Sequence, residues 1–448
     1  MKTFSELYND VEKVKVHLKN KGIKPNDRVF AFASPDYHLL VYMLAIFKLG
    51  ASVMYVDIFT KQDSFKNFFE KYQPDCILVS NKTIILKPFF RYARKIKKTI
   101  NVDKEISSRT MIVDEANDKV DDDAPALITA TTGSSGKPKA FIRTHKDLLE
   151  QLSLIHNNMK PVSDDEIILT TSYIYAFANL IQGFATVLPN INLSMDWHHH
   201  GIPKKIKTLS MLKITTIMTS PDFCLNLPNI YPNLMRLYFG GAILNYFEAK
   251  KIYAKYKNAD IYYIYGSTEC ALIAGINLSE YIQHLSRFNQ CLLGDICNGV
   301  EVKIDESGHI LVGSKALIRQ ELDRKFTEKY YDTNDIGRIK NGKLIYIGRK
   351  GTNLVLSGKR YYANEVEQQL ILEFRHLKKC AALQENGNNY LFVEGSIDKS
   401  EIKRYLLKRY EANFHIIILR RIPRDPKHHT KINYMKLRNI LIKSVQRL

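Results

Sequence analysis

The sequence lacks the features by which secreted and membrane-spanning proteins are recognised. Its longest apolar run, residues 39–47, is far shorter than the roughly 20 residues that a membrane-spanning helix needs. Residues 1–12 contain no apolar segment of the kind found in secretory signals. The chain also has no internal repeat and no low-complexity segment. These absences predict a cytoplasmic protein without a transmembrane segment.

Cysteine is scarce, with six residues among 448, and no two of them form a C-x-x-C pair. This spacing argues against the usual zinc and disulfide frameworks and indicates reduced thiols. The consecutive histidines 198–200 are expected to lie in a loop, because neighbouring residues rarely converge on one metal ion.

Negative charge is in short supply, and the formal net charge is +20 at pH 7. Residues 350–448 hold 20 lysines and arginines against 9 aspartates and glutamates. A basic carboxy-terminal segment favours an acidic partner, which leaves open nucleotide phosphates, an acidic carrier protein and peripheral contact with a membrane surface. A solvated face without a partner is the alternative. No nucleic-acid-binding motif is present, so no nucleic acid partner is expected.

The order of helical and apolar segments indicates an α/β fold. Residues 4–21 and 38–49 have helical spacing, and short apolar runs at 28–33 and 52–56 follow them. Strands that alternate with helices predict parallel sheets flanked by helices.

The pattern changes near residue 300 to short alternating strands, including a hairpin turn at Asn341-Gly342. This change predicts a small β-rich subdomain. The remainder has the size and rhythm of a small α+β domain. We therefore expect a large N-terminal domain over residues 1–348 and a small C-terminal domain over residues 349–448.

Residues 131–139, which read T-T-G-S-S-G-K-P-K, join an apolar strand to an amphipathic stretch that begins at His145. Small hydroxyl residues and two glycines allow a backbone to wrap closely round an anion such as a triphosphate. A Walker-type loop is excluded, because Gly133 and Gly136 are too close together and Pro138 follows the lysine. An ordinary solvated loop is the alternative.

Two further strands end in residues suited to a nucleotide. One runs into Gly240-Gly241-Ala242, where missing side chains allow a flat ring to approach the backbone. The other ends in Tyr265-Gly266-Ser267-Thr268-Glu269, which offers an aromatic ring, two hydroxyls and a carboxylate for stacking, phosphate and Mg²⁺. Each residue taken singly is more often structural.

Together these segments resemble the superfamily of adenylate-forming enzymes, which includes acyl-CoA synthetases, adenylation domains of peptide synthetases and luciferases. The resemblance covers nearly the whole chain. It matches the phosphate loop at 131–139, the adenine-binding segment at 240–242, the segment 265–269, a ribose-binding Asp335, the linker that starts at Gly348-Arg349, and a terminal segment with Lys431.

The resemblance implies formation of an acyl-adenylate from a carboxylic acid and ATP, followed by transfer to a thiol. In this scheme Lys431 contacts the α-phosphate and the ribose, Thr268 binds the α-phosphate, and Glu269 holds Mg²⁺ as the metal ligand. Asp335 and Arg349 hold the sugar, and Tyr265 stacks on adenine.

The resemblance assigns the remaining nucleotide contacts to two glycine-containing segments. The phosphate-loop residues expected to bind the cofactor are Thr131, Thr132, Gly133, Ser134, Ser135, Gly136 and Lys139. Gly240, Gly241 and Ala242 are expected at the adenine, and Gly266 and Ser267 are further residues expected to bind the nucleotide.

The chain departs from the family pattern at several positions. Gly351 stands at the hinge of the mobile carboxy-terminal domain, where relatives carry Asp or Lys. Asn334 replaces the glycine before the ribose-binding aspartate, and Thr430 replaces the glycine before the catalytic lysine.

The sequence favours an acid–thiol ligase that acts on a fatty or similar apolar acid, with ATP, Mg²⁺ and CoA as cofactors. Loading of the acid onto the phosphopantetheine of an acidic carrier protein is the close alternative. Aromatic residues in the segment 173–177 are candidates for an acyl pocket, although aromatic side chains more often belong to the core. A non-catalytic nucleotide-binding or basic nucleic-acid-binding protein is the alternative of another class.

Overall fold

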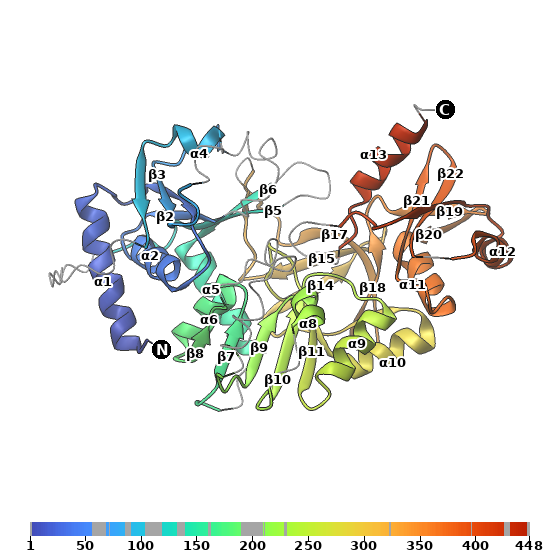
Figure 1. Cartoon of the computed structure of the whole chain (residues 1–448), viewed down its shortest axis with the longest axis horizontal. Coiled ribbons are helices and arrows are strands. Elements are labelled where there is room, and N and C mark those ends of the chain that lie inside the picture. The colour runs from blue at the N-terminus through green and yellow to red at the C-terminus, as the bar shows by residue number, and fades with distance from the viewer. Residues whose placement is uncertain are drawn as a thin grey trace. The chain divides into compact units, whose positions relative to one another are not determined.

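The computed structural model describes residues 2–55, 69–70, 72–85, 91–103, 119–131, 139–159, 163–189, 209, 211–227, 231–321, 324–395, 397–424 and 431–445 (Figure 1). The chain divides into two compact units. The first unit comprises Met1–Met218, Thr268–Ala271 and Lys315–Glu328, and the second comprises Thr219–Ser267, Leu272–Ser314 and Lys329–Leu448. The domain boundary expected after residue 348 does not coincide with this division into units, and it stays a prediction.

The first unit contains mainly parallel strands. Its helices are α1 (Phe4–Asn20), α2 (Tyr37–Lys48), α4 (Arg91–Lys95), α5 (His145–Asn158) and α6 (Tyr173–Ile181). Its strands are β1 (Arg28–Phe32), β2 (Ser52–Tyr55), β3 (Cys76–Val79), β4 (Lys98–Asn101), β5 (Pro125–Thr131), β6 (Lys139–Thr144), β7 (Ile167–Thr170), β8 (Ala185–Val187), β9 (Thr216–Thr219) and β16 (Gln320–Glu321).

One sheet of the first unit has the strand order β16-β6-β5-β2-β1-β3-β4. Strands β5, β2, β1, β3 and β4 run parallel, whereas β6 and β16 are antiparallel additions at one edge. All four residues of β3 are buried, as expected of a strand covered on both faces. A second group of parallel strands has the order β8-β7-β9.

The second unit begins with parallel strands and continues with antiparallel ones. Its helices are α8 (Pro221–Asn226), α9 (Tyr246–Lys255), α10 (Leu278–Phe288), α11 (Ala363–Glu373), α12 (Lys399–Tyr410) and α13 (Tyr434–Val445). Its strands are β10 (Arg236–Gly240), β11 (Asp260–Tyr265), β12 (Ala274–Asn277), β13 (Cys291–Ile296), β14 (Val300–Ile304), β15 (His309–Ser314), β17 (Tyr331–Lys340), β18 (Lys343–Arg349), β19 (Asn353–Leu356), β20 (Lys359–Tyr362), β21 (Lys379–Glu385), β22 (Asn388–Glu394) and β23 (His415–Leu419).

The larger sheet of the second unit follows the order β10-β11-β12-β13-β18-β17-β15-β14. The expected hairpin at Asn341-Gly342 is confirmed, because it joins the antiparallel pair β17 and β18. Asn341 and Gly342 have φ angles of 51° and 75°, the left-handed geometry that tight hairpin turns require.

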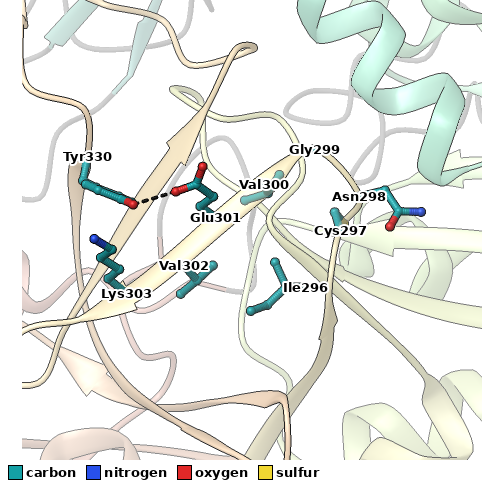
Figure 2. Close-up of a pocket in the computed structure, with 9 residues that line it drawn as sticks. All are labelled: Ile296, Cys297, Asn298, Gly299, Val300, Glu301, Val302, Lys303 and Tyr330. Carbon is teal, nitrogen blue, oxygen red and sulfur yellow. Dashed lines mark hydrogen bonds between the residues drawn. The ribbon is translucent and has the colours of Figure 1, made fainter.

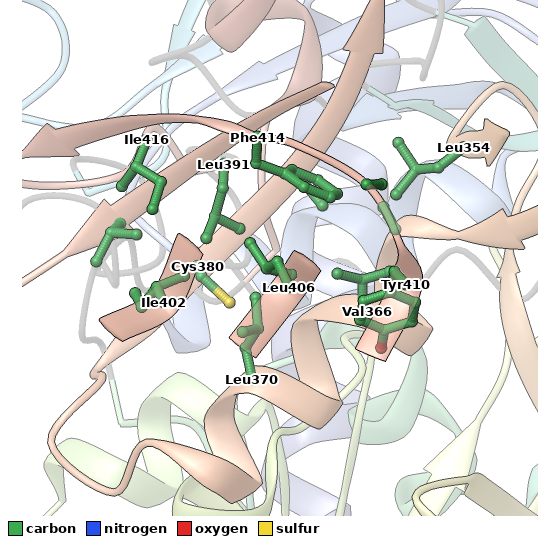
Figure 3. Packing of buried hydrophobic residues seen from close by; sticks show 14 of the residues in the cluster. Leu354, Val366, Leu370, Cys380, Leu391, Ile402, Leu406, Tyr410, Phe414 and Ile416 are labelled. Carbon is green, nitrogen blue, oxygen red and sulfur yellow. The ribbon is translucent and has the colours of Figure 1, made fainter. Parts of the chain in front are cut away.

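The carboxy-terminal part has a three-stranded sheet, β21-β22-β23, with helices on both faces. Cys380 and Ala382 pack into one cluster with α11 and α12 (Figure 3 shows Cys380 in this cluster). Ala381 and Leu383 pack into another cluster with α13. Successive side chains of a strand point to opposite faces, so one strand contributes to both cores. The α+β character expected here is confirmed.

Polar contacts within the second unit join the carboxy-terminal part to α9 and to Leu244, two residues before that helix. The Lys379 Nζ atom lies 3.2 Å from Glu248 Oε1. Gln368 Nε2 donates a hydrogen bond to the Leu244 carbonyl at 3.2 Å. Only 9% of the Lys379 side chain is exposed, so this ion pair is largely shielded from solvent.

Candidate functional site

The predicted adenine-binding segment lies where two parallel strands end. Gly240 of β10 is paired with Ile264 of β11, so residues 240–242 and 265–267 leave the sheet at the same edge. A Cβ atom on Gly240 would overlap the Ile264 carbonyl oxygen, and Gly241 has a φ of 102°. Glycine at these two positions is therefore required by close strand packing and by backbone conformation.

Tyr265, Asp335 and Arg349 form a polar group in the second unit. The Tyr265 hydroxyl donates a hydrogen bond to Asp335 Oδ2 at 2.8 Å. Arg349 Nη1 lies 3.6 Å from Asp335 Oδ1, because the two residues are paired across β17 and β18. Burial, with the nearby Asp335 charge, raises the pKa of Tyr265 well above its ordinary value. The phenol therefore stays protonated and acts as a donor to the carboxylate.

The backbone around Asp335 explains one departure from the family pattern. Asn334 has a φ of 60°, in the left-handed region that glycine and asparagine tolerate best. Its carbonyl accepts a hydrogen bond from Lys350 N at 2.9 Å. Gly351, the residue after Lys350, has a φ of 79°, and no atom of the described residues lies within 4 Å of the position that a Cβ would take. Its place as a hinge stays a prediction.

Thr268 and Glu269 belong to the first unit, where side chains from two other elements hold their backbone. The Thr268 carbonyl accepts a hydrogen bond from Arg143 Nη2 at 3.0 Å. The Glu269 carbonyl accepts one from Ile318 N at 2.9 Å and one from Gln151 Nε2 at 3.3 Å. The orientation of this pair of residues is thus fixed before any ligand binds.

Arg143 lies on β6 and is only 6% exposed. Its Nε donates to Gln151 Oε1 at 2.8 Å, and its Nη1 donates to Thr129 Oγ1 at 2.7 Å. Burial lowers the pKa of Arg143 to about 10, and the nearby charges of Glu269 and Asp147 oppose that shift. The guanidinium is still protonated at neutral pH.

The predicted phosphate loop connects β5 to β6, with Thr131 paired with Lys139 at its base. The structure differs from expectation in placing a strand, β6, between the loop and the helix that begins at His145. Lys139 Nζ lies 3.2 Å from Glu321 Oε1, and the lysine side chain is 42% exposed. Residues 132–136, predicted to bind phosphate, lie outside the described residues.

Lys431 is exposed and lies shortly before α13 in the carboxy-terminal part. The next residue, Ile432, forms a bridge with Arg424, and Asn433 N donates a hydrogen bond to the Pro423 carbonyl at 2.9 Å. These contacts fix the backbone that carries the lysine. Its catalytic role stays a prediction.

The aromatic residues of α6 lie in a packed environment. Tyr173 and Phe177 are 7% and 3% exposed. Phe177 meets Phe47 edge-on at a centroid distance of 5.6 Å, and Tyr173 meets Tyr55 edge-on at 5.3 Å. Such contacts are those of a hydrophobic core. These two residues therefore give no direct support to an apolar acyl pocket.

Within the described ranges, no three His, Cys, Asp or Glu side chains converge as a metal site. The sequence places a single carboxylate, Glu269, for Mg²⁺. That arrangement fits Mg²⁺, which is commonly held by one or two carboxylates together with substrate phosphates and water. The hydrogen bonds that fix the Glu269 backbone also suit Mg²⁺, which requires nearly ideal octahedral coordination.

The second unit also has an open pocket of about 500 Å³ along β14 (Figure 2). Tyr330 donates a hydrogen bond to Glu301 at 2.6 Å, and Lys303 Nζ lies 4.4 Å from the centre of the Tyr330 ring. None of the predicted nucleotide-binding residues that the structure describes is among those that line it. We assign it no part in the nucleotide chemistry.

Three polar residues of the first unit escaped the sequence interpretation: Arg143, Gln151 and Glu321. The available signal was weak. An arginine that directly follows the apolar run Ala140 to Ile142 indicates either an exposed edge or a buried charge. Only the structure shows that Arg143 is buried.

The family model described as AMP-binding enzyme matches residues 1–319. The chain belongs to this family. The match ends before Asp335, Arg349, Gly351 and Lys431, so the roles of these four residues depend on the motifs and on geometry.

Proteins similar to this chain carry different names. Bacitracin synthase 2 of Bacillus licheniformis is 21% identical over 87% of this chain, and the chain spans only 16% of its length. The D-alanine–D-alanyl carrier protein ligase of Staphylococcus aureus (strain bovine RF122 / ET3-1) is 24% identical over 82% of this chain and 77% of its own length.

Among solved structures, the O-succinylbenzoate coenzyme A synthetase (MenE) of Bacillus subtilis in complex with AMP matches with a TM-score of 0.79 and 18% identity. The match covers 97% of this chain and 93% of that one. At this identity the likeness shows the fold alone. The predicted fold class, a large mixed α/β domain followed by a smaller one, is confirmed. No helix in the described ranges is long and apolar enough to cross a membrane.

Proposed function

We propose that this protein is an acid–thiol ligase, which activates a carboxylic acid with ATP and transfers the acyl group to the thiol of CoA. The observation that carries the proposal is the group formed by Tyr265, Asp335 and Arg349 at the end of β11. A carboxylate held by a phenol and faced by a guanidinium suits the two hydroxyls of a ribose, which donate to the carboxylate.

Chain connectivity supports a common ligand for this group and for Thr268. Only Gly266 and Ser267 separate Tyr265 from Thr268 in the sequence. Their Cα atoms are therefore no more than about 11 Å apart in any conformation of the chain. That span is compatible with one residue at the adenosine and the other at the α-phosphate of the same ATP.

In the proposed first step, a carboxylate oxygen of the acid attacks the α-phosphorus of ATP. The bond from that phosphorus to the bridging oxygen breaks, and pyrophosphate leaves with the electron pair. Lys139, with the phosphate loop, would bind the leaving group, and Lys431 would neutralise charge at the α-phosphate. Mg²⁺, held by Glu269 and the phosphates, supplies charge neutralisation when bound.

In the second step a thiolate attacks the acyl carbon and AMP leaves with the electron pair. The two hypotheses differ in the thiol that accepts the acyl group, which belongs either to CoA or to the phosphopantetheine of a carrier protein. The Staphylococcus aureus relative is named as a carrier protein ligase, which supports a phosphopantetheine carrier as the second candidate. The basic carboxy-terminal part suits either acceptor, because CoA carries phosphates and carrier proteins are usually acidic.

The class of acid is part of the proposal. Fatty and other apolar acids remain our first choice. Tyr173 and Phe177 pack in the core and give no direct support to an apolar acyl pocket. The substrate panel therefore also includes amino acids.

Acid-dependent exchange of labelled pyrophosphate into ATP, measured over a panel of fatty acids, aromatic acids and amino acids, tests the proposal. Addition of CoA or of a phosphopantetheinylated carrier protein then identifies the acceptor by thioester formation. ATP binding without exchange for any acid would favour a non-catalytic nucleotide-binding protein.

The variant Lys431→Ala tests the role of the terminal segment. We expect it to lower the exchange rate by about 100-fold or more while ATP binding stays measurable. Lys436→Ala is the matched control, since Lys436 is another exposed lysine of the same segment. An exchange rate in Lys431→Ala equal to that of the control would contradict the assignment.

A further inference from the structure

The side chain of Arg143 joins three segments of the first unit. Its three hydrogen bonds go to Gln151 Oε1, Thr129 Oγ1 and the Thr268 carbonyl, at 2.8, 2.7 and 3.0 Å. All three partners are neutral oxygens. Since Arg143 is only 6% exposed, water solvates its charge very little.

Burial of a cation has a desolvation cost, and hydrogen bonds to neutral oxygens offset that cost only in part. Core packing alone would therefore be served better by an apolar side chain. Apolar side chains of similar volume often replace buried charges without loss of stability. Phe141, two residues earlier on the same face of β6, is fully buried and shows that this face accepts apolar side chains. The position of Arg143 therefore calls for a reason beyond core packing.

Gln151 extends the same network to the next peptide. Its Oε1 accepts from Arg143, and its Nε2 donates to the Glu269 carbonyl at 3.3 Å and to the Ala316 carbonyl at 3.2 Å. Gln151 is fully buried. The carbonyls of Thr268 and Glu269 are thus each held by one of the two side chains.

The charge of Arg143 also acts on the same segment. The largest favourable electrostatic influence on its guanidinium comes from Glu269, followed by Asp147. A fixed positive charge behind Thr268 and Glu269 favours the approach of an anionic nucleotide and needs no rearrangement when the nucleotide binds.

We propose that Arg143 and Gln151 are positioning residues for Mg·ATP: they hold the Thr268–Glu269 backbone in its binding orientation, and Arg143 adds a buried positive charge behind it. This inference rests on the proposed function, because Thr268 and Glu269 are the residues proposed to meet the α-phosphate and Mg²⁺. Neither Arg143 nor Gln151 touches the substrate. Both act through the segment that does.

The two contributions predict different kinetic effects. Arg143→Lys and Gln151→Leu keep the charge at position 143 but lose part of the fixed geometry. Both should lower kcat of pyrophosphate exchange by about 10- to 100-fold, the usual effect of removing a residue that supports a ligand-binding group. Their KM for Mg·ATP should stay within about twofold of that of the wild type.

Arg143→Met loses both the geometry and the charge. Its kcat should fall as in Arg143→Lys, and in addition its KM and its calorimetric Kd for Mg·ATP should rise by about fivefold or more. The KM for the acid should not change. Thr216→Val, which removes a buried hydrogen bond of 2.7 Å to Glu166 in the same unit, is the control for a general loss of packing.

Melting temperature and circular dichroism are measured on each variant, so that kinetic constants refer to folded protein. The inference is overturned if Arg143→Met binds Mg·ATP as the wild type does, or if its kcat and KM match those of Thr216→Val. A wild-type protein without exchange activity for any acid would refute the proposed function. The calorimetric comparison of Mg·ATP binding would still decide the inference in that case.

Discussion

Glu367 in α11 allows a quantitative prediction about stability and pH. The carboxylate is buried, and its Oε1 accepts hydrogen bonds from Tyr434 Oη at 2.6 Å and from Ala382 N at 2.8 Å. Burial raises its pKa from the ordinary value of 4.5 to about 7, and the two hydrogen bonds and Lys379 oppose the rise. Glu367→Gln keeps an oxygen acceptor at the same place but removes the ionisable proton.

The sign follows from the bound proton. Between pH 4.5 and about 7 the folded protein retains a proton on Glu367 that the unfolded chain has lost. The free energy of unfolding therefore decreases as pH rises through this interval. The difference between the two pKa values corresponds to a loss of about 3 kcal/mol by pH 8.

Urea unfolding of the wild type and of Glu367→Gln at pH 5 and pH 8, followed by circular dichroism, checks this value. The stability of Glu367→Gln relative to wild type should improve by about 3 kcal/mol between pH 5 and pH 8. Hydrogen exchange at the Ala382 amide reports the same change locally.

Glu385→Gln is the control, because Glu385 is a partly exposed carboxylate paired with Arg438 at 3.0 Å. If the wild type and Glu367→Gln lose stability in parallel between the two pH values, to within about 0.5 kcal/mol, Glu367 is not the titrating group and the reasoning fails.

Three other variants test individual contacts within the two units. Glu321→Gln removes the carboxylate 3.2 Å from Lys139 and should lower the KM for Mg·ATP by up to about fivefold in exchange assays; an unchanged KM would show that the pair does not compete with phosphate. Tyr265→Phe removes the donor to Asp335 and should raise the calorimetric Kd for ATP by about tenfold; an equal Kd would remove Asp335 from the ribose assignment. Gly240→Ala places a Cβ against the Ile264 carbonyl and should destabilise the fold by about 1–3 kcal/mol, whereas an unchanged melting temperature would mean that β10 and β11 are not packed this closely.

The sequence predicted features that depend on contiguous residues. The turn at Asn341-Gly342 and the helices Phe4–Asn20 and Tyr37–Lys48 were located because their signals are local. The motifs at residues 240–242 and 265–269 were found because each directly follows an apolar strand. Family membership followed from the order of such motifs along the chain.

Contacts between distant segments could not be predicted in this way. Arg143 meets Thr268 across 125 positions, and Lys139 meets Glu321 across 182. No periodicity in a short window reports such a pairing. Strand β21 illustrates a related limit: both of its faces are buried, so the run Cys380 to Leu383 is apolar throughout and does not show which residue faces which helix.

The ion pair between Lys379 and Glu248 bears on how the carboxy-terminal part could move. A rotation about Gly351 would have to pull an ammonium group that is 9% exposed away from its carboxylate at 3.2 Å. Separation of a largely buried ion pair is costly unless both charged groups regain water or other polar contacts. Substitutions at this pair would then change the rate of such a rotation without any change in the residues predicted to hold the nucleotide.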